Sequence, residues 1–219
     1  MGEATEHWNE RYSDAARIWS GWANASLVTE VAALPPGTAL ELGSGEGADA
    51  IHLAGLGWSV TAVDVSDVAL SRAAEAAAAA GVGDRIDWVV ADLADWRSTG
   101  TADLVVACFL HSRLPGFPRE QILRRAVAAV APGGRLLVVS HAAPPPWSKL
   151  GHGHGHGHGH ENPDPGHGQE LPSLEQELET LALGEGWSLE TAELREREAT
   201  GPDGTTAVLT DIVILARRG

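Results

Sequence analysis

The sequence predicts an α/β protein: a doubly wound, mostly parallel seven-stranded sheet with helices on both faces and an antiparallel C-terminal hairpin. From residue 38 to 140, short apolar runs alternate with alanine-rich helical segments, as in crossover connections of a parallel sheet. Runs such as LVVA and LLVV are apolar without alternation, which is typical of strands covered on both sides. The last two strand-like runs are joined by ATGPDGT, a hairpin turn signal.

Each element is expected from its own pattern. The predicted strands occupy residues 38–43, 59–65, 85–93, 101–111, 135–141, 187–198 and 206–218. The predicted helices occupy residues 25–34, 48–57, 66–83, 118–134 and 173–186. Ser66 suits the N-cap of its helix, which should end at Gly81. Pro132 and the two glycines that follow it should stop the helix that begins at residue 118.

Composition excludes several classes of protein. The 219 residues carry 30 Asp and Glu against 15 Lys and Arg, so no basic footprint is expected for nucleic acid or an anionic membrane. The length suits one sizeable domain. A single cysteine, Cys108, cannot form an internal disulfide. No apolar signal segment is seen in the first thirty residues, and no run reaches the roughly 18 apolar residues of a membrane span. A soluble, cytoplasmic protein is expected.

A glycine-rich turn follows the first strand. In ELGSGEGADA, the residues Gly43, Gly45 and Gly47 lie where the strand passes into a helix, so the backbone leaves room for a ligand. Asp64 ends the next strand, where its carboxylate can accept hydrogen bonds from the two hydroxyls of a ribose. Together these features predict a nucleoside site at this edge of the sheet.

Two kinds of nucleoside fit this pattern. Gly43, Gly45 and Ala48 satisfy the G-x-G-x-x-A form of a dinucleotide fingerprint, so an NAD(P)-dependent oxidoreductase is one alternative. Three other features favour a different nucleoside: Glu41 before the glycines, Asp92 in VVADLADW, and the APGGRLLVV strand followed by a terminal hairpin.

With ELGSGEG and VDVS, these features resemble the class I S-adenosylmethionine-dependent methyltransferases, which have a Rossmann-like fold. The resemblance runs from about Trp8 to the last strand. The start of the chain, HWNERYSDAARIWSG, is similar to the aromatic N-terminal arm of the tellurite-resistance and thiopurine methyltransferase branch. The resemblance implies an enzyme that transfers a methyl group from S-adenosylmethionine to a small-molecule acceptor.

The resemblance also implies which residues bind the cofactor. They are Trp19, Glu41, Gly43, Ser44, Gly45, Gly47, Asp64, Val65, Asp92, Leu93 and Cys108. The glycine-rich turn would line the methionine and ribose, with Glu41 beneath it. Asp64 would hold the ribose hydroxyls, and Asp92 would accept a hydrogen bond from the adenine amino group. The backbone of Leu93 would support the adenine ring, and the carbonyl of Cys108 would meet the methionine amino group.

The tryptophans fall into groups with different expected roles. Those at strand positions are expected in the core: Trp58, Trp88 and Trp187. Trp96 could pack there or cover the adenine. Trp19, with residues 20–21, would fold over the cofactor as a lid.

Two histidines follow the fourth and fifth strands, His111 and His141, at the edge where ligands bind to open α/β sheets. Methyl transfer needs an in-line approach of the acceptor and, for some acceptors, removal of a proton. Histidine suits this because its unperturbed pKa is about 6.5. His111 is therefore predicted to act as the acceptor-side base or to orient the acceptor. Soft acceptors such as a thiol, a selenide or a tellurite-derived anion would need little base catalysis.

The stretch GHGHGHGHGH, residues 151–160, predicts a metal site. Alternate residues of an extended chain point to the same side about 6.6–6.8 Å apart, so neighbouring histidines can converge on one ion. Neutral imidazole suits Zn, Ni, Cu or Co. The expected ligands of this divalent metal are His141, His152, His154, His156, His158 and His160. The alternative is a low-complexity insertion that binds metal only adventitiously.

One methyltransferase domain, a monomer or a homodimer, is therefore expected. Residues 1–36 would form the lid arm and first helix, and residues 37–142 the cofactor-binding core. Residues 143–170 would form a histidine-, glycine- and proline-rich insertion, and residues 171–219 the C-terminal helix and hairpin. Besides the oxidoreductase, a metal-binding or metal-sensing protein on a methyltransferase scaffold is an alternative.

Overall fold

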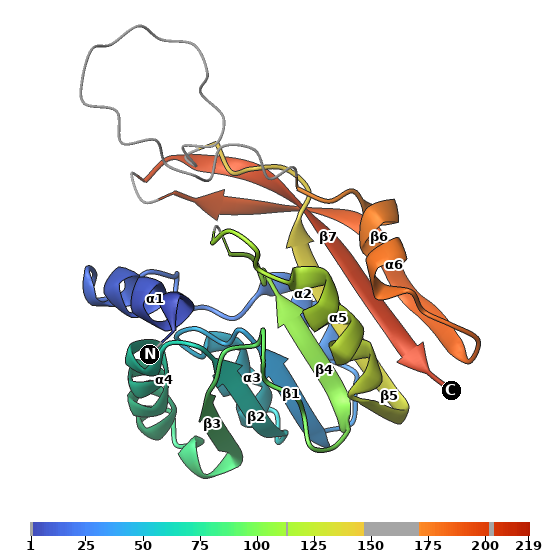
Figure 1. Cartoon of the computed structure of the whole chain (residues 1–219), viewed down its shortest axis with the longest axis horizontal. Coiled ribbons are helices and arrows are strands. Elements are labelled where there is room, and N and C mark those ends of the chain that lie inside the picture. The colour runs from blue at the N-terminus through green and yellow to red at the C-terminus, as the bar shows by residue number, and fades with distance from the viewer. Residues whose placement is uncertain (1, 113, 147–170, 202–203) are drawn as a thin grey trace, which may run out of the picture.

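Within the described part of the chain, seven strands form one sheet in the order β3-β2-β1-β4-β5-β7-β6 (Figure 1). The computed structural model describes residues 2–112, 114–146, 171–201 and 204–219. The strands are β1 (Thr38–Leu42), β2 (Ser59–Asp64), β3 (Ile86–Val90), β4 (Ala102–Cys108), β5 (Val130–His141), β6 (Trp187–Thr200) and β7 (Thr206–Arg218). β7 is antiparallel to β5 and β6, and the other neighbouring strands are parallel. The predicted fold, mostly parallel with an antiparallel hairpin, is confirmed.

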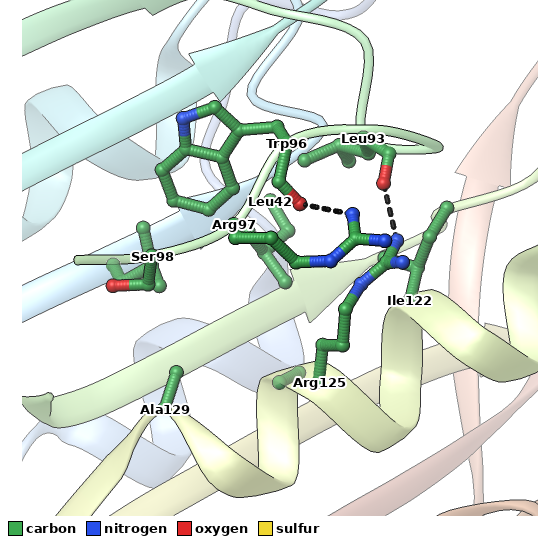
Figure 2. A pocket seen from close by; sticks show the side chains of 10 residues that line it. Leu42, Leu93, Trp96, Arg97, Ser98, Ile122, Arg125 and Ala129 are labelled. Carbon is green, nitrogen blue, oxygen red and sulfur yellow. Dashed lines mark hydrogen bonds between the residues drawn. The ribbon is translucent and has the colours of Figure 1, made fainter. Parts of the chain in front are cut away.

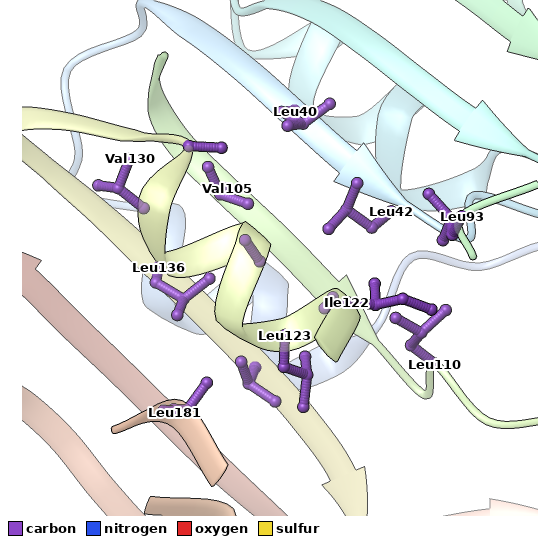
Figure 3. Close-up of a cluster of buried hydrophobic side chains, with 14 of the residues drawn as sticks. Leu40, Leu42, Leu93, Val105, Leu110, Ile122, Leu123, Val130, Leu136 and Leu181 are labelled. Atoms are coloured by element: carbon purple, nitrogen blue, oxygen red, sulfur yellow. The ribbon is translucent and has the colours of Figure 1, made fainter. Parts of the chain in front are cut away.

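Helices cover both faces of this sheet. The helices on the sheet are α2 (Ala25–Val31), α3 (Ala48–Gly55), α4 (Asp67–Ala79), α5 (Arg119–Ala128) and α6 (Leu174–Leu181), and α1 (Glu3–Ser13) packs against α4. α5 and α6 pack against one face (Figure 3), and α2, α3 and α4 pack against the other. Among the described residues, no helix has the length and apolar character that crossing a bilayer requires.

The strands supply both faces because successive residues of a strand point to opposite sides. In the run LLVV of β5, Leu136 and Val138 join the core cluster under α5 and α6, whereas Leu137 and Val139 join the cluster under α2, α3 and α4. All four side chains are fully buried. An apolar run without alternation is therefore the pattern that a sheet buried on both faces requires.

The ends of two helices follow from their capping residues. The Ser66 hydroxyl accepts a hydrogen bond from the Ala69 amide at 3.1 Å, which confirms the predicted N-cap of α4. At the start of α6, Ser173 and Gln176 form a capping box in which each side chain accepts a hydrogen bond from the backbone of the other residue.

Two elements differ from the prediction. α5 ends at Ala128 and β5 begins at Val130, so the helix stops before Pro132 rather than at it. The reason is tertiary: Val130 is fully buried and pairs with Ala102 of β4, and a register irregularity follows. The first part of the aromatic arm forms α1, a helix that the sequence did not predict, because Tyr12 is its single buried residue and leaves little periodic signal.

The tryptophans expected in the core lie there. Trp58 is 2% exposed and belongs to the cluster under α2, α3 and α4, and Trp88, partly buried, packs against the same cluster. Trp187 packs against the opposite cluster under α5 and α6.

Candidate functional site

The glycine-rich turn and Asp64 are in direct contact at the carboxyl ends of β1 and β2. Oδ2 of Asp64 accepts a hydrogen bond from the Gly45 amide at 2.8 Å, and Oδ1 accepts one from the Ser66 amide at 2.9 Å. Burial raises the pKa of the Asp64 carboxyl, and these backbone hydrogen bonds act in the opposite direction. The two features that predicted a nucleoside site therefore form one structural unit.

Two of the three glycines face segments that surround the turn. A Cβ added at Gly43 would lie 2.7 Å from Cδ1 of Leu110, in the loop that follows β4. A Cβ added at Gly45 would lie 2.8 Å from the hydroxyl oxygen of Tyr12, in α1. Both glycines therefore let these side chains approach the backbone of the turn at the carboxyl ends of the strands more closely than a Cβ would allow.

Gly47 has a different role, because it allows α4 and β3 to pack against the turn. A Cβ there would lie 2.6 Å from Trp88 and 2.7 Å from Ala73, and the residue has a φ of +77°. Gly47→Ala should therefore lower the free energy of unfolding by about 1–3 kcal/mol, the usual cost of overpacking. Urea denaturation measures this loss. Gly81→Ala is the matched control, because Gly81 has a similar φ of +73° but nothing within 4 Å of the added Cβ. Equal losses in the two variants would contradict the packing role.

Buried carboxyl groups lie beneath the turn. Glu41 is 4% exposed, and the cause of its raised pKa is first burial and then the charges of Asp49 and Asp64. The Ala50 amide donates a hydrogen bond to the Glu41 carboxyl. Its Oε2 atom has no hydrogen-bond partner among the described residues. A buried acidic oxygen without a partner is costly, so this position suits a cationic group of a ligand.

The Cys108 thiol points into the same acidic region. It donates a hydrogen bond to Asp49, and burial raises its pKa well above the usual value. A buried thiol in acidic surroundings is a poor nucleophile. Only the backbone carbonyl of Cys108, at the end of β4, therefore remains as a candidate cofactor contact.

The N-terminal arm covers the glycine-rich turn. Nε1 of Trp19 donates to the hydroxyl oxygen of Tyr12 at 2.9 Å. The backbone amides of Ile18 and Trp19 donate to the Glu46 carboxylate at 3.2 and 3.1 Å. Trp19, which is 47% exposed, thus stands where a lid was expected. Sequence reasoning missed Tyr12, although it is the single tyrosine of the chain.

Asp92 and Leu93 begin the loop after β3. Oδ1 of Asp92 accepts from the Ala94 amide at 2.8 Å, which fixes the carboxylate within its own turn. Arg125 of α5 donates to the carbonyl oxygens of Leu93 and Ala94. The guanidinium therefore holds the segment that was expected to contact the adenine.

A pocket lies beside this loop, on the face that α5 covers (Figure 2). Leu42, Trp96, Ile122 and Arg125 are among its lining residues. Trp96 packs against the core cluster under α5 and α6, so packing is the role that the structure gives it. The pocket does not include the glycines of the turn.

His111, in the loop after β4, and His141, the last residue of β5, lie close together. Their ring centroids are 6.2 Å apart and their planes differ by 11°. Burial, and then the charges of Arg119 and His141, lower the pKa of His111 to about 3. Its Nε2 atom is buried without a hydrogen-bond partner among the described residues. A ring with this pKa stays neutral and accepts a proton poorly, so orienting the acceptor suits His111 better than acting as its base.

His141 has partners that the sequence did not predict. Its Nδ1 lies 3.1 Å from Oδ1 of Asp211, and Nε of Arg197 donates to Oδ2 of the same carboxylate at 2.5 Å. The Phe109 ring stacks on the imidazole with a centroid distance of 4.2 Å. One sequence signal could have indicated this contact: Asp211 is an acid within the mostly apolar run of the last strand.

The expected metal site is not assembled by the residues that the structure describes. Within residues 2–112, 114–146, 171–201 and 204–219, no group of three or more His, Cys, Asp or Glu side chains could hold a metal ion. The other expected ligands lie outside the described residues: His152, His154, His156, His158 and His160.

Residues 39–134, which include the turn, Asp64 and Cys108, match a family model described as a methyltransferase domain. Residues 39–134 are therefore similar to methyltransferase domains. No curated protein matches the chain. The strand order also favours a methyltransferase over a dinucleotide-binding enzyme. In this sheet the antiparallel strand β7 lies between β5 and β6, whereas dinucleotide-binding sheets have the order 3-2-1-4-5-6 and no such strand. The oxidoreductase alternative therefore finds no support.

Solved structures share the fold of this chain over nearly its whole length. The N-methyltransferase NodS from Bradyrhizobium japonicum WM9, in complex with S-adenosyl-L-homocysteine, is 18% identical, with a TM-score of 0.67 over 99% of both chains. TehB from Haemophilus influenzae is 17% identical, with a TM-score of 0.67 over 99% of this chain and 67% of its own. A structure reported with the conversion of a disulfide bond into a thioacetal group during echinomycin biosynthesis is 24% identical, with a TM-score of 0.67 over 98% of this chain and 92% of its own. At these identities the likeness concerns the fold. The predicted kind of enzyme, an S-adenosylmethionine-dependent methyltransferase, is confirmed.

Proposed function

We propose that this methyltransferase binds S-adenosylmethionine at the glycine-rich turn and Asp64 and transfers its methyl group to a small-molecule acceptor. The observation that carries this proposal is the Oε2 atom of Glu41, which is buried beneath the turn without a hydrogen-bond partner among the described residues. S-adenosylmethionine brings two cationic groups, a sulfonium and an ammonium. An opposite charge nearby favours the ionised form of a buried carboxyl, so ligand and site are complementary.

The other residues of the site have the chemical groups that binding of this cofactor requires. Gly43 and Gly45 present backbone without a Cβ at the strand ends, where Leu110 and Tyr12 approach it closely. The Asp64 carboxylate already accepts backbone hydrogen bonds from Gly45, Val65 and Ser66, and a carboxylate has about four acceptor sites, so it can still accept one from a ribose hydroxyl. Asp92 would accept from the adenine amino group, and Trp19 would cover the cofactor. S-adenosylmethionine supplies the electrophilic methyl group, and the chain binds and orients it.

Asp64→Ala is expected to weaken S-adenosylmethionine binding by about 1–3 kcal/mol, because ribose hydroxyls would lose their acceptor. Isothermal titration calorimetry with S-adenosylmethionine measures the change, and NAD serves as the competing ligand. Asp87→Ala, an exposed position on β3, is the control that should bind as the wild type does. Unchanged affinity in Asp64→Ala would refute the ribose assignment. Tight binding of NAD alone would replace the proposed cofactor.

We also propose that the histidine-rich tract, residues 151–160, binds a divalent metal ion. The support is the sequence, which repeats imidazoles at alternate positions in the segment between β5 and α6. Removing the tract should abolish binding of Zn²⁺ or Ni²⁺ and leave the affinity for S-adenosylmethionine unchanged, as calorimetry with each ligand would measure. Replacing the tract histidines by serine separates loss of ligands from loss of length. Loss of cofactor affinity in either variant would place the tract in the cofactor site instead.

A further inference from the structure

A buried acid on β7 faces the imidazole that ends β5. His141 and Asp211 are opposite each other in the antiparallel register of β5 and β7, with Nδ1 of the ring 3.1 Å from Oδ1 of the carboxylate. Asp211 is 1% exposed, whereas the His141 side chain is 23% exposed. A carboxylate at Nδ1 favours the tautomer in which Nδ1 carries the proton and Nε2 keeps its lone pair.

Arg197 of β6 occupies the second carboxylate oxygen of Asp211, so that both oxygens accept hydrogen bonds. Its Nε atom donates to Oδ2 at 2.5 Å, so the guanidinium supplies the counter-charge that a buried carboxylate needs. With both oxygens accepting, Asp211 can hold the Nδ1–H of the imidazole but has no proton to offer it. The pair thus has the arrangement in which a buried acid fixes the tautomer and orientation of a catalytic histidine.

Phe109 supports this imidazole from the loop that follows β4. The residue directly follows Cys108 and has a φ of +50°, a left-handed conformation that costs a non-glycine residue about 1–3 kcal/mol. Its amide donates to the Val139 carbonyl at 2.8 Å, and its ring stacks on His141. Backbone strain of this kind persists at functional sites, and here it aims the ring that supports His141.

We propose that His141, oriented by Asp211, accepts the proton of the methyl acceptor, and that the acceptor is accordingly a neutral hydroxyl or amine. The inference rests on the proposed methyl transfer and names the acceptor class for the same site. His111, with its ring parallel to that of His141, has the orienting role. The acceptor class follows because a thiolate or an oxyanion carries no proton to be removed and would gain nothing from this pair.

The chemistry balances with these groups alone. The lone pair of the acceptor oxygen or nitrogen forms the bond to the methyl carbon. The bond between that carbon and sulfur breaks, and its electron pair stays on sulfur, which leaves the neutral thioether of S-adenosylhomocysteine. The acceptor proton passes to Nε2 of His141 and from there to solvent. A cationic cofactor and a neutral acceptor thus give two neutral products and one proton.

The first test reads the tautomer of His141 by nitrogen NMR of the full chain with isotope-labelled histidine. The His141 signals are those that disappear in His141→Gln. The expected result in the wild type is the Nδ1–H tautomer at neutral pH. Asp211→Asn, whose amide can donate to Nδ1, should shift the ring toward the Nε2–H tautomer, while Asp87→Asn on β3 should not. A wild-type ring in the Nε2–H form would overturn the proposal, whether or not Asp211→Asn folds.

The second test measures methyl transfer from radiolabelled S-adenosylmethionine to catechol, aniline, nitrothiophenol and tellurite. Labelling of catechol or aniline is expected, with kcat falling about 10²–10⁴-fold in His141→Gln and an unchanged dissociation constant for S-adenosylmethionine. Turnover confined to nitrothiophenol and tellurite would overturn the acceptor class. If none of the four compounds is labelled, the NMR measurement of the His141 tautomer decides whether the proposal stands. Because that measurement needs neither cofactor nor acceptor, its failure is distinct from failure of cofactor binding, which calorimetry detects.

Discussion

Glu177→Ala is expected to lower the free energy of unfolding by about 3–5 kcal/mol, because it leaves the Arg119 guanidinium without its counter-charge. Glu177, in α6, is fully buried, and its two carboxylate oxygens accept from Arg119 of α5 at 2.5 and 3.0 Å. A buried pair is costly to break from one side, since the remaining ion keeps its desolvation penalty without the attraction. Urea denaturation followed by circular dichroism measures the loss.

Arg119 connects this ion pair to the functional edge of the sheet. Its Nε atom donates to the Leu110 carbonyl at 2.9 Å, and one terminal nitrogen donates to the Ser140 hydroxyl at 2.9 Å. Leu110 faces Gly43 and precedes His111, so the arginine ties α6 to the loop that lies beside the expected cofactor. Glu177→Ala should therefore also loosen this loop, which hydrogen exchange would detect as faster exchange of its amides.

Two controls distinguish a buried pair from an ordinary surface pair. Glu120 and Arg124 are one turn apart on α5, 2.6 Å from each other, with both side chains more than half exposed. Glu120→Ala should therefore cost only about 0–1 kcal/mol. The double variant Arg119→Met with Glu177→Leu removes both charges and should recover most of the stability lost in Glu177→Ala. A Glu177→Ala loss no larger than that of Glu120→Ala would contradict the argument.

The sheet was predictable because its strands carry two independent signals. Apolar runs that supply both faces mark buried strands, as Leu136 to Val139 show, and Gly-rich turns mark their ends. The hairpin signal in residues 199–205 then made β7 antiparallel. The start of β5 was not predictable, because Val130 continues the helical pattern of α5 and is recruited to the sheet only by pairing with Ala102. Local propensity was overridden by a tertiary contact there.

In the candidate site, too, some contacts follow from local sequence patterns and others depend on tertiary structure. The contact between Gly45 and Asp64 follows from a general rule, that neighbouring parallel strands end at the same edge. The contact of His141 with Asp211 spans 70 residues and depends on the exact register of β5 and β7. Sequence patterns predict strands but not which residues stand opposite each other. Burial was equally hard to predict: the sequence offered His111 as a base or as an orienter of the acceptor, and the lowered pKa of the buried ring favours the second role.

Glu41→Gln is expected to stabilise the cofactor-free chain above neutral pH. Burial raises the pKa of Glu41 above its ordinary value of 4.5, so the folded chain favours the neutral form. The contribution of this group to stability is therefore fully present below pH 4.5 and is lost as the pH rises through the raised pKa. Glutamine has a similar shape and cannot ionise. Urea denaturation across this pH range should show the variant and the wild type alike in acid and the variant more stable above neutral pH.

The same substitution should weaken S-adenosylmethionine binding above neutral pH by about 2–5 kcal/mol, the cost of removing one partner of a buried charge pair. Wild-type binding should release a proton, since the cationic cofactor favours the ionised form of Glu41. Calorimetry in buffers of different ionisation enthalpy detects that proton, and Glu41→Gln should lose it. S-adenosylhomocysteine keeps the ammonium but has an uncharged sulfur, so the variant should lose less affinity for it. Equal losses for the two ligands would show that Glu41 does not sense the sulfonium, and unchanged binding of both would remove the charge argument for the site.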